Sequence, residues 1–161
     1  MPSRMMSTEE IVAILEQTPH RLRELTDGVS RSQLHVSVAG EWAVIEILAH
    51  LRACADKWGE AIEIIATTDH PTIRAVNPTT WIKSTDYTEL EFGGSLRAFA
   101  KQRARLLGLL AELPPSAWSR TATVVGAGTP LELSVHTYAN RMARHERSHW
   151  RQVAKAVATL R

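Results

Sequence analysis

The sequence has a single cysteine, Cys54, among 161 residues, so a framework of internal disulfides is excluded. No segment approaches the ~18 continuous apolar residues of a membrane-spanning helix. Neither sign of charge dominates, because 19 basic and 17 acidic residues leave a net charge of +2. That balance argues against binding to nucleic acid. These absences predict a cytoplasmic protein whose partners are neither nucleic acids nor membranes.

What the sequence does contain is ordinary for a globular protein, with 44% hydrophobic and 22% charged residues. A chain of this length can bury a hydrophobic core within one domain. We find no internal repeat, low-complexity segment or linker composition that would divide it. We therefore expect a single domain over residues 1–161.

Four amphipathic segments predict an all-α protein. The first follows Ser7, which forms a capping box with Glu10. In the others, apolar residues recur three and four positions apart, as on the buried face of a helix. Their expected ranges are about Ala43 to about Ala66, roughly Thr88 to Glu112, and the C-terminal stretch from Tyr138 to Leu160.

Two connections between these helices differ from short loops. A long one joins the second and third helices, and its prolines, Pro71 and Pro78, exclude regular helix there. Connections of such length often cover a site. Residues 121–133 predict an extended excursion around Gly126 and Gly128, as in a short hairpin. The expected architecture is a four-helix bundle with a long crossover and a short extended excursion before the last helix.

The most informative stretch is His145-Glu146-Arg147-Ser148-His149. Residues four apart share one face of a helix, so both imidazoles can reach one metal ion. The apolar pattern places both histidines on the buried stripe, where two hydrogen-bonded core histidines are the alternative. The string also fits the zinc-protease motif H-E-x-x-H, but residues 150–161 contain no third ligand. This absence argues against a protease.

A third ligand must then come from upstream, and His50 is the best candidate. It borders the apolar stripe of the second helix, where an unpaired polar group costs on the order of 1–3 kcal/mol. A hydrogen bond to a backbone carbonyl or a tyrosine hydroxyl is the alternative for His50. Cys54, one turn later, is either a fourth ligand or a small core residue. Tyr138 is either a hydrogen-bonding member of the site or a packed core tyrosine.

Two segments resemble a known family. The stretch from Glu41 to Leu51 resembles the second-helix signature of the DinB-like (DinB/YfiT) superfamily. The histidine pair followed by Gln152 resembles the signature of its final helix. Each motif is short, but their order and spacing together are specific, and the resemblance covers almost the whole chain.

The resemblance implies several properties. It implies an up-down-down-up order of the four helices, commonly a homodimer, and a divalent-metal site formed by the triad His50, His145 and His149. The intervening Glu146 is not a ligand in that family, and we expect it at the surface. Metal identity does not follow from three histidines, because zinc and nickel both suit imidazole.

Members of the superfamily include thiol S-transferases that use low-molecular-weight thiols, a maleylpyruvate isomerase and hydrolases. The resemblance therefore implies a metal-dependent enzyme that acts on a small molecule through a metal-activated thiolate or water. A non-catalytic, metal-stabilised bundle serving in stress response or protein interaction is the alternative.

Several other residues carry structural expectations. Trp42 and Trp58 are interpreted as packing anchors, and His70 as a solvated loop residue. The basic residues of the third helix predict a solvated face, or else a face that binds an anion; they are Arg97, Lys101, Arg103 and Arg105. The sequence names neither the substrate nor a general acid or base.

Overall fold

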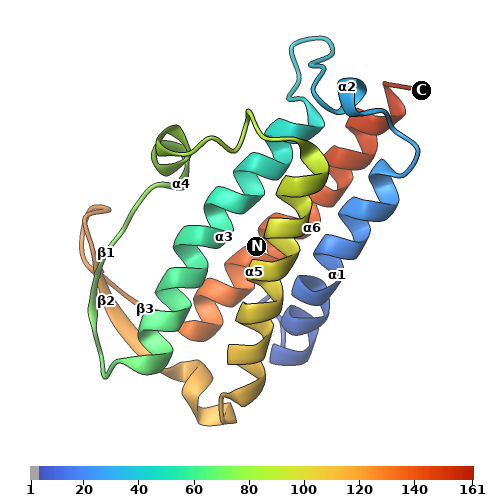
Figure 1. Ribbon diagram of the computed structural model, residues 1–161. Coiled ribbons are helices and arrows are strands. Elements are labelled where there is room, and N and C mark those ends of the chain that lie inside the picture. Colours follow the sequence, from blue (N-terminus) through green and yellow to red (C-terminus); the bar gives the residue numbers. More distant parts are fainter. Residues whose placement is uncertain (1–3) are drawn as a thin grey trace.

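The computed structural model describes residues 4–161, so residues 1–3 of the expected domain lie outside the described part. Four long helices form a bundle (Figure 1): α1 (Thr8–Thr26), α3 (Val44–Thr67), α5 (Phe92–Glu112) and α6 (Val135–Ala158). Helices α1 and α6 run in one direction and α3 and α5 in the other, which gives the order up, down, down, up. The predicted all-α bundle and its long crossover are confirmed.

The ends of the long helices follow from capping side chains. Ser7 accepts a hydrogen bond from the Glu10 amide at 3.1 Å, as the capping box predicts. Helix α5 begins at Phe92 and not at Thr88, because the Glu91 carboxylate accepts hydrogen bonds from the amides of the next two glycines. An acidic side chain at a helix N-terminus is favoured by the helix dipole. The expected start of this helix was therefore one turn too early.

The connections contain short elements that the sequence pattern does not predict. Helix α2 (Arg31–Leu34) follows α1, and the crossover holds strand β1 (Thr72–Arg74), helix α4 (Pro78–Trp81) and the 3₁₀ turn η1 (Ile82–Ser84). The expectation that Pro78 excludes helix is wrong. Proline is well tolerated in the first turn of a helix, and Asn77 caps this one by accepting a hydrogen bond from the Thr79 amide.

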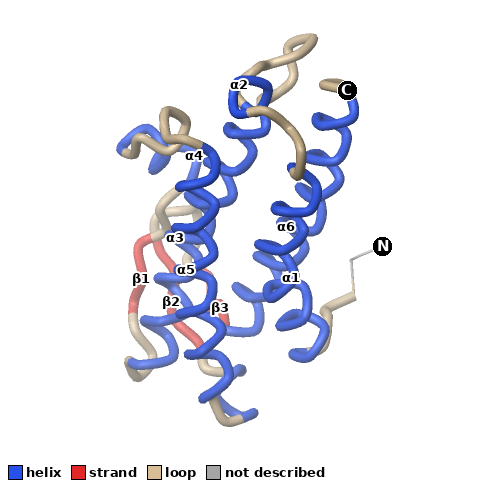
Figure 2. The backbone as a smooth tube through the Cα atoms, turned by 45° about the vertical axis from the view of Figure 1, so that its right-hand side comes forward, coloured by secondary structure: helices blue, strands red, loops and turns tan. Residues whose placement is uncertain are grey.

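The predicted extended excursion forms a hairpin after the 3₁₀ turn η2 (Pro115–Ser119). Strands β2 (Thr121–Val125) and β3 (Leu131–Ser134) pair antiparallel, and β1 adds to β2 in parallel. Gly126 and Gly128 adopt positive φ angles of 91° and 85° at the turn, which glycine tolerates best. Figure 2 shows this small sheet beside the helical bundle.

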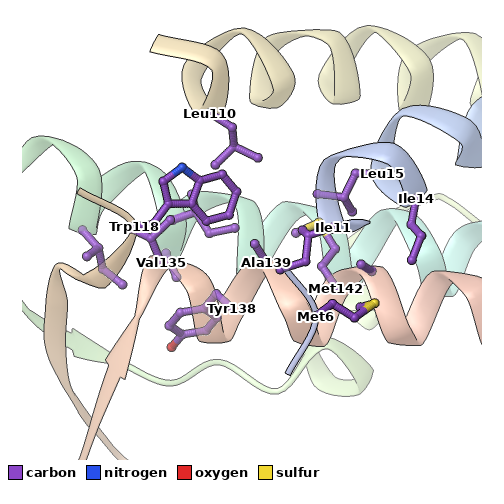
Figure 3. Close-up of a cluster of buried hydrophobic side chains, with 14 of the residues drawn as sticks. Met6, Ile11, Ile14, Leu15, Leu110, Trp118, Val135, Tyr138, Ala139 and Met142 are labelled. Atoms are coloured by element: carbon purple, nitrogen blue, oxygen red, sulfur yellow. The ribbon is translucent and has the colours of Figure 1, made fainter. Parts of the chain in front are cut away.

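The hydrophobic core lies between the four long helices and extends under the hairpin. Figure 3 shows one buried cluster, in which Ile11 and Leu15 of α1 and Leu110 of α5 meet Ala139 and Met142 of α6. A second cluster, around Leu22, Leu48 and Phe99, fills the other end of the bundle. Among residues 4–161, no helix combines the length and hydropathy that a membrane span requires.

Candidate metal centre

Three histidines converge between α3 and α6. The Nε2 atom of His145 lies 2.8 Å from Nε2 of His50 and 3.0 Å from Nε2 of His149. One ring nitrogen from each residue lies within 4.8 Å of the others, and all three side chains are half-buried. The structure thus brings His50, chosen from the sequence as the third member, to the predicted pair.

The local helices explain this convergence. Ile47, Leu48 and Leu51 are buried to 1% exposure or less, which fixes the rotation of α3 and turns His50 toward α6. On α6 the two histidines are one turn apart and therefore lie on the same side. The three rings are held by rigid helices and not by loops, so the arrangement does not depend on a mobile segment.

Hydrogen bonding among the three rings cannot satisfy them. A neutral ring nitrogen carries either one proton or one lone pair, so His145 Nε2 can pair with only one of its two neighbours. His145 Nδ1 is also buried without a hydrogen-bond partner among the described residues. A divalent ion would instead accept a lone pair from each of the three nitrogens. The donor set therefore fits a metal that prefers imidazole.

Electrostatics keep the rings in the form that binds metal. Burial lowers the pKa of His145 to about 3, and repulsion from His149 and His50 acts in the same direction. Burial, followed by repulsion from His149, also lowers the pKa of His50. Because desolvation disfavours the charged imidazolium, both rings are neutral at pH 7. Neutral imidazole is the ligating form.

Gln152 orients one of the rings. Its side-chain Oε1 accepts a hydrogen bond from Nδ1 of His149. Since a carbonyl oxygen can only accept, Nδ1 carries the proton and Nε2 presents its lone pair to the other histidines. Supporting hydrogen bonds of this kind are typical of metal-ligating histidines. The sequence pointed to Gln152 only through the resemblance.

Cys54 lies beside the three rings but not among the converging nitrogens. Its Sγ atom is 3.8 Å from Nε2 of His50 and 3.9 Å from Nε2 of His145. Burial raises the pKa of the thiol to about 12, and the negative charge of Glu146 acts in the same direction. Without a metal ion the thiol therefore stays protonated, whereas thiolate is the ligating form. This environment favours the small-core-residue interpretation.

Aromatic side chains flank the cluster at both ends. The Trp58 and His145 ring centroids are 5.1 Å apart, and those of Trp42 and His50 are 5.4 Å apart. Trp42 is 45% exposed, so the expectation that it anchors the core is wrong. Tyr138 is buried in the core cluster, and within the described part of the chain its hydroxyl makes no hydrogen bond to the histidines. This placement favours a packed core tyrosine.

Glu146 is not at the surface, contrary to expectation. It is 1% exposed and forms an ion pair with Arg103 of α5, which is 2% exposed. Glu146 follows His145 by one residue, about 100° around the helix, so its side chain lies on a neighbouring side of α6, where it meets Thr18 of α1 and Arg103 of α5. The expected solvated basic face is therefore wrong for Arg103, although the other three basic residues of that helix are exposed.

The ion pair is completed by hydrogen bonds. Arg103 donates to both carboxylate oxygens of Glu146 and to the Leu15 carbonyl, while the Thr18 hydroxyl donates to Glu146 at 2.7 Å. The Trp150 indole donates to Thr18 in turn. The spacing of Arg103 with the apolar positions of its helix was the signal that could have revealed this burial.

The crossover does not bring His70 to the cluster. Its Nε2 atom lies 2.8 Å from a Glu132 carboxylate oxygen on β3, and both side chains are more than half exposed. Residue 70 therefore belongs to the surface of the sheet, as an exposed loop residue.

Comparison with known proteins identifies a matching family and two relatives with provisional names. A family model described as the DinB superfamily matches residues 14–153. A Geobacillus kaustophilus protein provisionally named a metal-dependent hydrolase is 28% identical over 153 residues, which cover 91% of this chain and 82% of the relative. A protein of the same provisional name from Geobacillus thermodenitrificans is 26% identical over 141 residues, covering 83% and 76%.

A solved structure shares the fold. YfiT from Bacillus subtilis, described as a probable metal-dependent hydrolase with an unusual four-helix bundle topology, superposes with a TM-score of 0.73. The match covers 96% of this chain and 91% of that one, at 20% sequence identity. Because the family model spans most of the sequence and all three converging histidines, the chain belongs to the DinB superfamily.

Proposed function

We propose that His50, His145 and His149 bind one divalent metal ion and that the protein is a metal-dependent hydrolase of a small molecule. The observation that carries this proposal is the convergence of three Nε2 atoms that cannot satisfy one another. The provisional names of the two relatives point to the same class of reaction.

The ligand set favours catalysis over a purely structural role. Structural zinc sites are closed by four protein ligands, whereas catalytic sites use three and keep a position open. Three neutral imidazoles also leave the ion's charge uncompensated, which favours an anion in that position. A metal bound in this way lowers the pKa of water from 15.7 to about 7 and so supplies a nucleophile at neutral pH.

The protein's own residues would position and shield the reaction. Gln152 holds His149 in the ligating tautomer, while the Trp58 and Trp42 rings lie against His145 and His50. The nearest carboxylate in sequence, Glu146, is held by Arg103 through both of its oxygens. It is therefore not a general base for this site.

Thiol S-transfer is the competing activity. An uncompensated divalent charge attracts thiolate as well as hydroxide, and a low-molecular-weight thiol would then replace water as the nucleophile. Zinc and nickel are the expected metals for either reaction. The homodimer, the cytoplasmic location and the lack of a nucleic-acid partner also stay predictions.

Metal content tests the site. Untagged wild-type protein, His50→Ala and the control His136→Ala would be analysed by inductively coupled plasma mass spectrometry after incubation with zinc or nickel. His136 is a suitable control because it shares α6 but contacts the Met6 carbonyl, away from the cluster. We expect near-stoichiometric metal in the wild type and the control and little in His50→Ala. Full metal content in His50→Ala would refute the triad.

Activity separates the remaining alternatives. The metal-loaded protein would be tested on small esters and amides, and on small electrophiles with an added thiol. Hydrolysis that disappears on chelation and in His145→Ala supports the proposal, and thiol-dependent turnover alone supports S-transfer. Stoichiometric metal with neither activity would favour the non-catalytic bundle.

A further inference from the structure

A cavity of about 800 Å³ lies next to the histidine cluster. It is enclosed by α3, the first turns of α6, the small sheet and the segment that leads into α4. Trp58 lines this cavity, and the same indole ring lies edge-on to His145. The cavity therefore ends one aromatic ring away from the proposed metal site.

The charges around this cavity are mainly positive. Lys57, Arg74 and Arg141 line it, and Glu60 is the one carboxylate in its lining. Glu60 is already engaged by Lys57, whose Nζ atom is 3.2 Å from its carboxylate. Neither arginine has an ion-pair partner within residues 4–161. The cavity thus presents two guanidinium groups without a counter-charge.

Both arginines have defined positions. Arg141 lies one turn before His145 on α6, with its guanidinium carbon 5.5 Å from the Tyr138 ring centroid and 5.9 Å from that of Trp58. Arg74 extends from β1 across the hairpin turn, where a Cβ on Gly126 would lie 3.4 Å from its Cγ. This distance is an ordinary van der Waals contact, so the Arg74 side chain packs directly against the hairpin turn.

The remaining wall is apolar. It is formed by aliphatic side chains of α3 and the three strands together with the two aromatic rings, and its aliphatic members include Ile64, Ile73, Val124, Leu131 and Leu133. Binding pockets commonly combine such walls with a few polar groups that fix orientation.

A second cavity that borders α3 differs in the sign of its charge. This cavity, of about 660 Å³, lies between α3 and α5 and is lined by Asp56, Glu60, Glu63 and Glu112. Its two arginines are both paired, one with Glu146 and the other with Glu63. The uncompensated guanidinium groups therefore face the cavity that adjoins the histidines.

We propose that the cavity binds the substrate as an organic anion, with Arg141 and Arg74 holding a carboxylate or similar group. Guanidinium matches such groups with paired, charge-assisted hydrogen bonds. The apolar or aromatic body of the molecule packs against the apolar wall formed by the sheet and α3. Its role as substrate rests on the proposed function, because the bond to be cleaved must reach the histidine cluster past Trp58.

A pair of fluorescent probes tests the charge requirement. 8-Anilinonaphthalene-1-sulfonate and N-phenyl-1-naphthylamine share an aromatic body, and only the first carries a negative charge. Both would be titrated into zinc-loaded wild type, Arg141→Gln, Arg74→Gln and Arg147→Gln. Arg147 provides the control, because it is exposed on the same helix and does not line the cavity.

We expect each cavity variant to weaken the anionic probe by about tenfold, the magnitude of one lost charged hydrogen bond, and to change the neutral probe by less than about twofold. Arg147→Gln should change neither. An unchanged affinity for the anion in both cavity variants would overturn the proposal, as would an equal loss for both probes in variants with wild-type circular dichroism.

His145→Ala separates this proposal from the metal site. Retained binding of the anionic probe in this variant, still sensitive to Arg141→Gln, would support the cavity whether or not metal is bound. If the anion were lost in His145→Ala and unaffected by the arginine changes, the metal would be its binding site. The cavity proposal would then fail while the metal proposal stands.

Discussion

Helix α6 carries two polar clusters on neighbouring faces, and only one of them is complete. On one face Glu146 is neutralised by Arg103 and hydrogen-bonded to Thr18. On the other face, His145 and His149 meet His50, with no counter-charge and an unsatisfied ring nitrogen. Buried polar groups are normally paired, so the first cluster needs nothing from outside the chain and the second needs a ligand.

The contrast shows that a sequence motif alone does not determine the role of each of its residues. The string from His145 to His149 fits a zinc-protease pattern in which the glutamate acts on the metal side. In this structure Glu146 lies on a neighbouring face of the helix, where its ion pair with Arg103 stabilises the bundle instead. The face of the helix on which a residue lies, together with what completes its hydrogen bonds, separates structure from function.

Removing Glu146 from the complete cluster should change the free energy of unfolding more than any other substitution considered. Glu146→Ala leaves the Arg103 guanidinium buried without its partner, which should lower the free energy of unfolding by about 3–5 kcal/mol. Urea denaturation of chelator-treated protein measures this change. Glu63→Ala is the control, because its ion pair with Arg105 is exposed and should contribute less than about 1 kcal/mol. Equal losses of stability in the two variants would show that burial does not make the Glu146–Arg103 ion pair more important than the exposed Glu63–Arg105 pair.

Removing a histidine from the incomplete cluster should lower the stability of the protein only when metal is present. Zinc at 100 times its dissociation constant should stabilise the wild type by about 2.7 kcal/mol and His145→Leu not at all. Without metal, the variant should be no less stable than the wild type, because an unsatisfied buried nitrogen has been removed. Denaturation with and without zinc tests both statements. Equal stabilisation of the variant by zinc would contradict the assignment.

A smaller effect is expected from the residue that orients His149. Gln152→Leu removes the acceptor of the Nδ1 proton and should weaken zinc binding by about tenfold, a typical cost for a supporting hydrogen bond. Competition with a chromophoric chelator measures the affinity. Gln102→Leu is the control, since Gln102 donates to Asp56 of α3 and does not touch the histidines. Indistinguishable affinities in the two variants would remove Gln152 from the site.

The smallest expected effect is a dependence of stability on pH in the metal-free protein. The pKa of His145 is about 3 in the folded state and near its usual 6.5 in the unfolded state. The unfolded state therefore binds more protons below pH 6.5, and stability is lost as the pH falls. Since the ring is only half-buried, we expect a loss of about 1 kcal/mol from pH 7 to pH 5. His145→Leu should show a shallower dependence, and an identical slope would contradict this account.

The features that the sequence predicted are those encoded by local periodicity. The four helices and the common face of His145 and His149 follow from spacing, and the hairpin follows from the glycines at its turn. His50 could be selected because an imidazole among aliphatic residues requires a partner. Short elements could not be found in this way, since β1 exists through pairing with β2, about 50 residues later in the chain.

The buried ion pair was missed for a related reason. Charged residues are usually exposed, so residue type assigned Glu146 and Arg103 to the surface, although the spacing of Arg103 matches the apolar positions of its helix. Only the packing of α5 and α1 against α6 shows that each has its partner, 43 residues away in sequence. The capping of α5 by Glu91 was also missed, which shifted the start of that helix by one turn.

X-ray absorption at the zinc K-edge of the zinc-loaded protein tests the central claim most directly. Three histidines and an open position predict nitrogen or oxygen neighbours at about 2.0–2.1 Å, with imidazole scattering and no sulfur. A sulfur neighbour at about 2.3 Å would identify Cys54 as a fourth ligand and close the site, contradicting the catalytic account. Bound zinc without imidazole scattering would contradict the histidine triad itself.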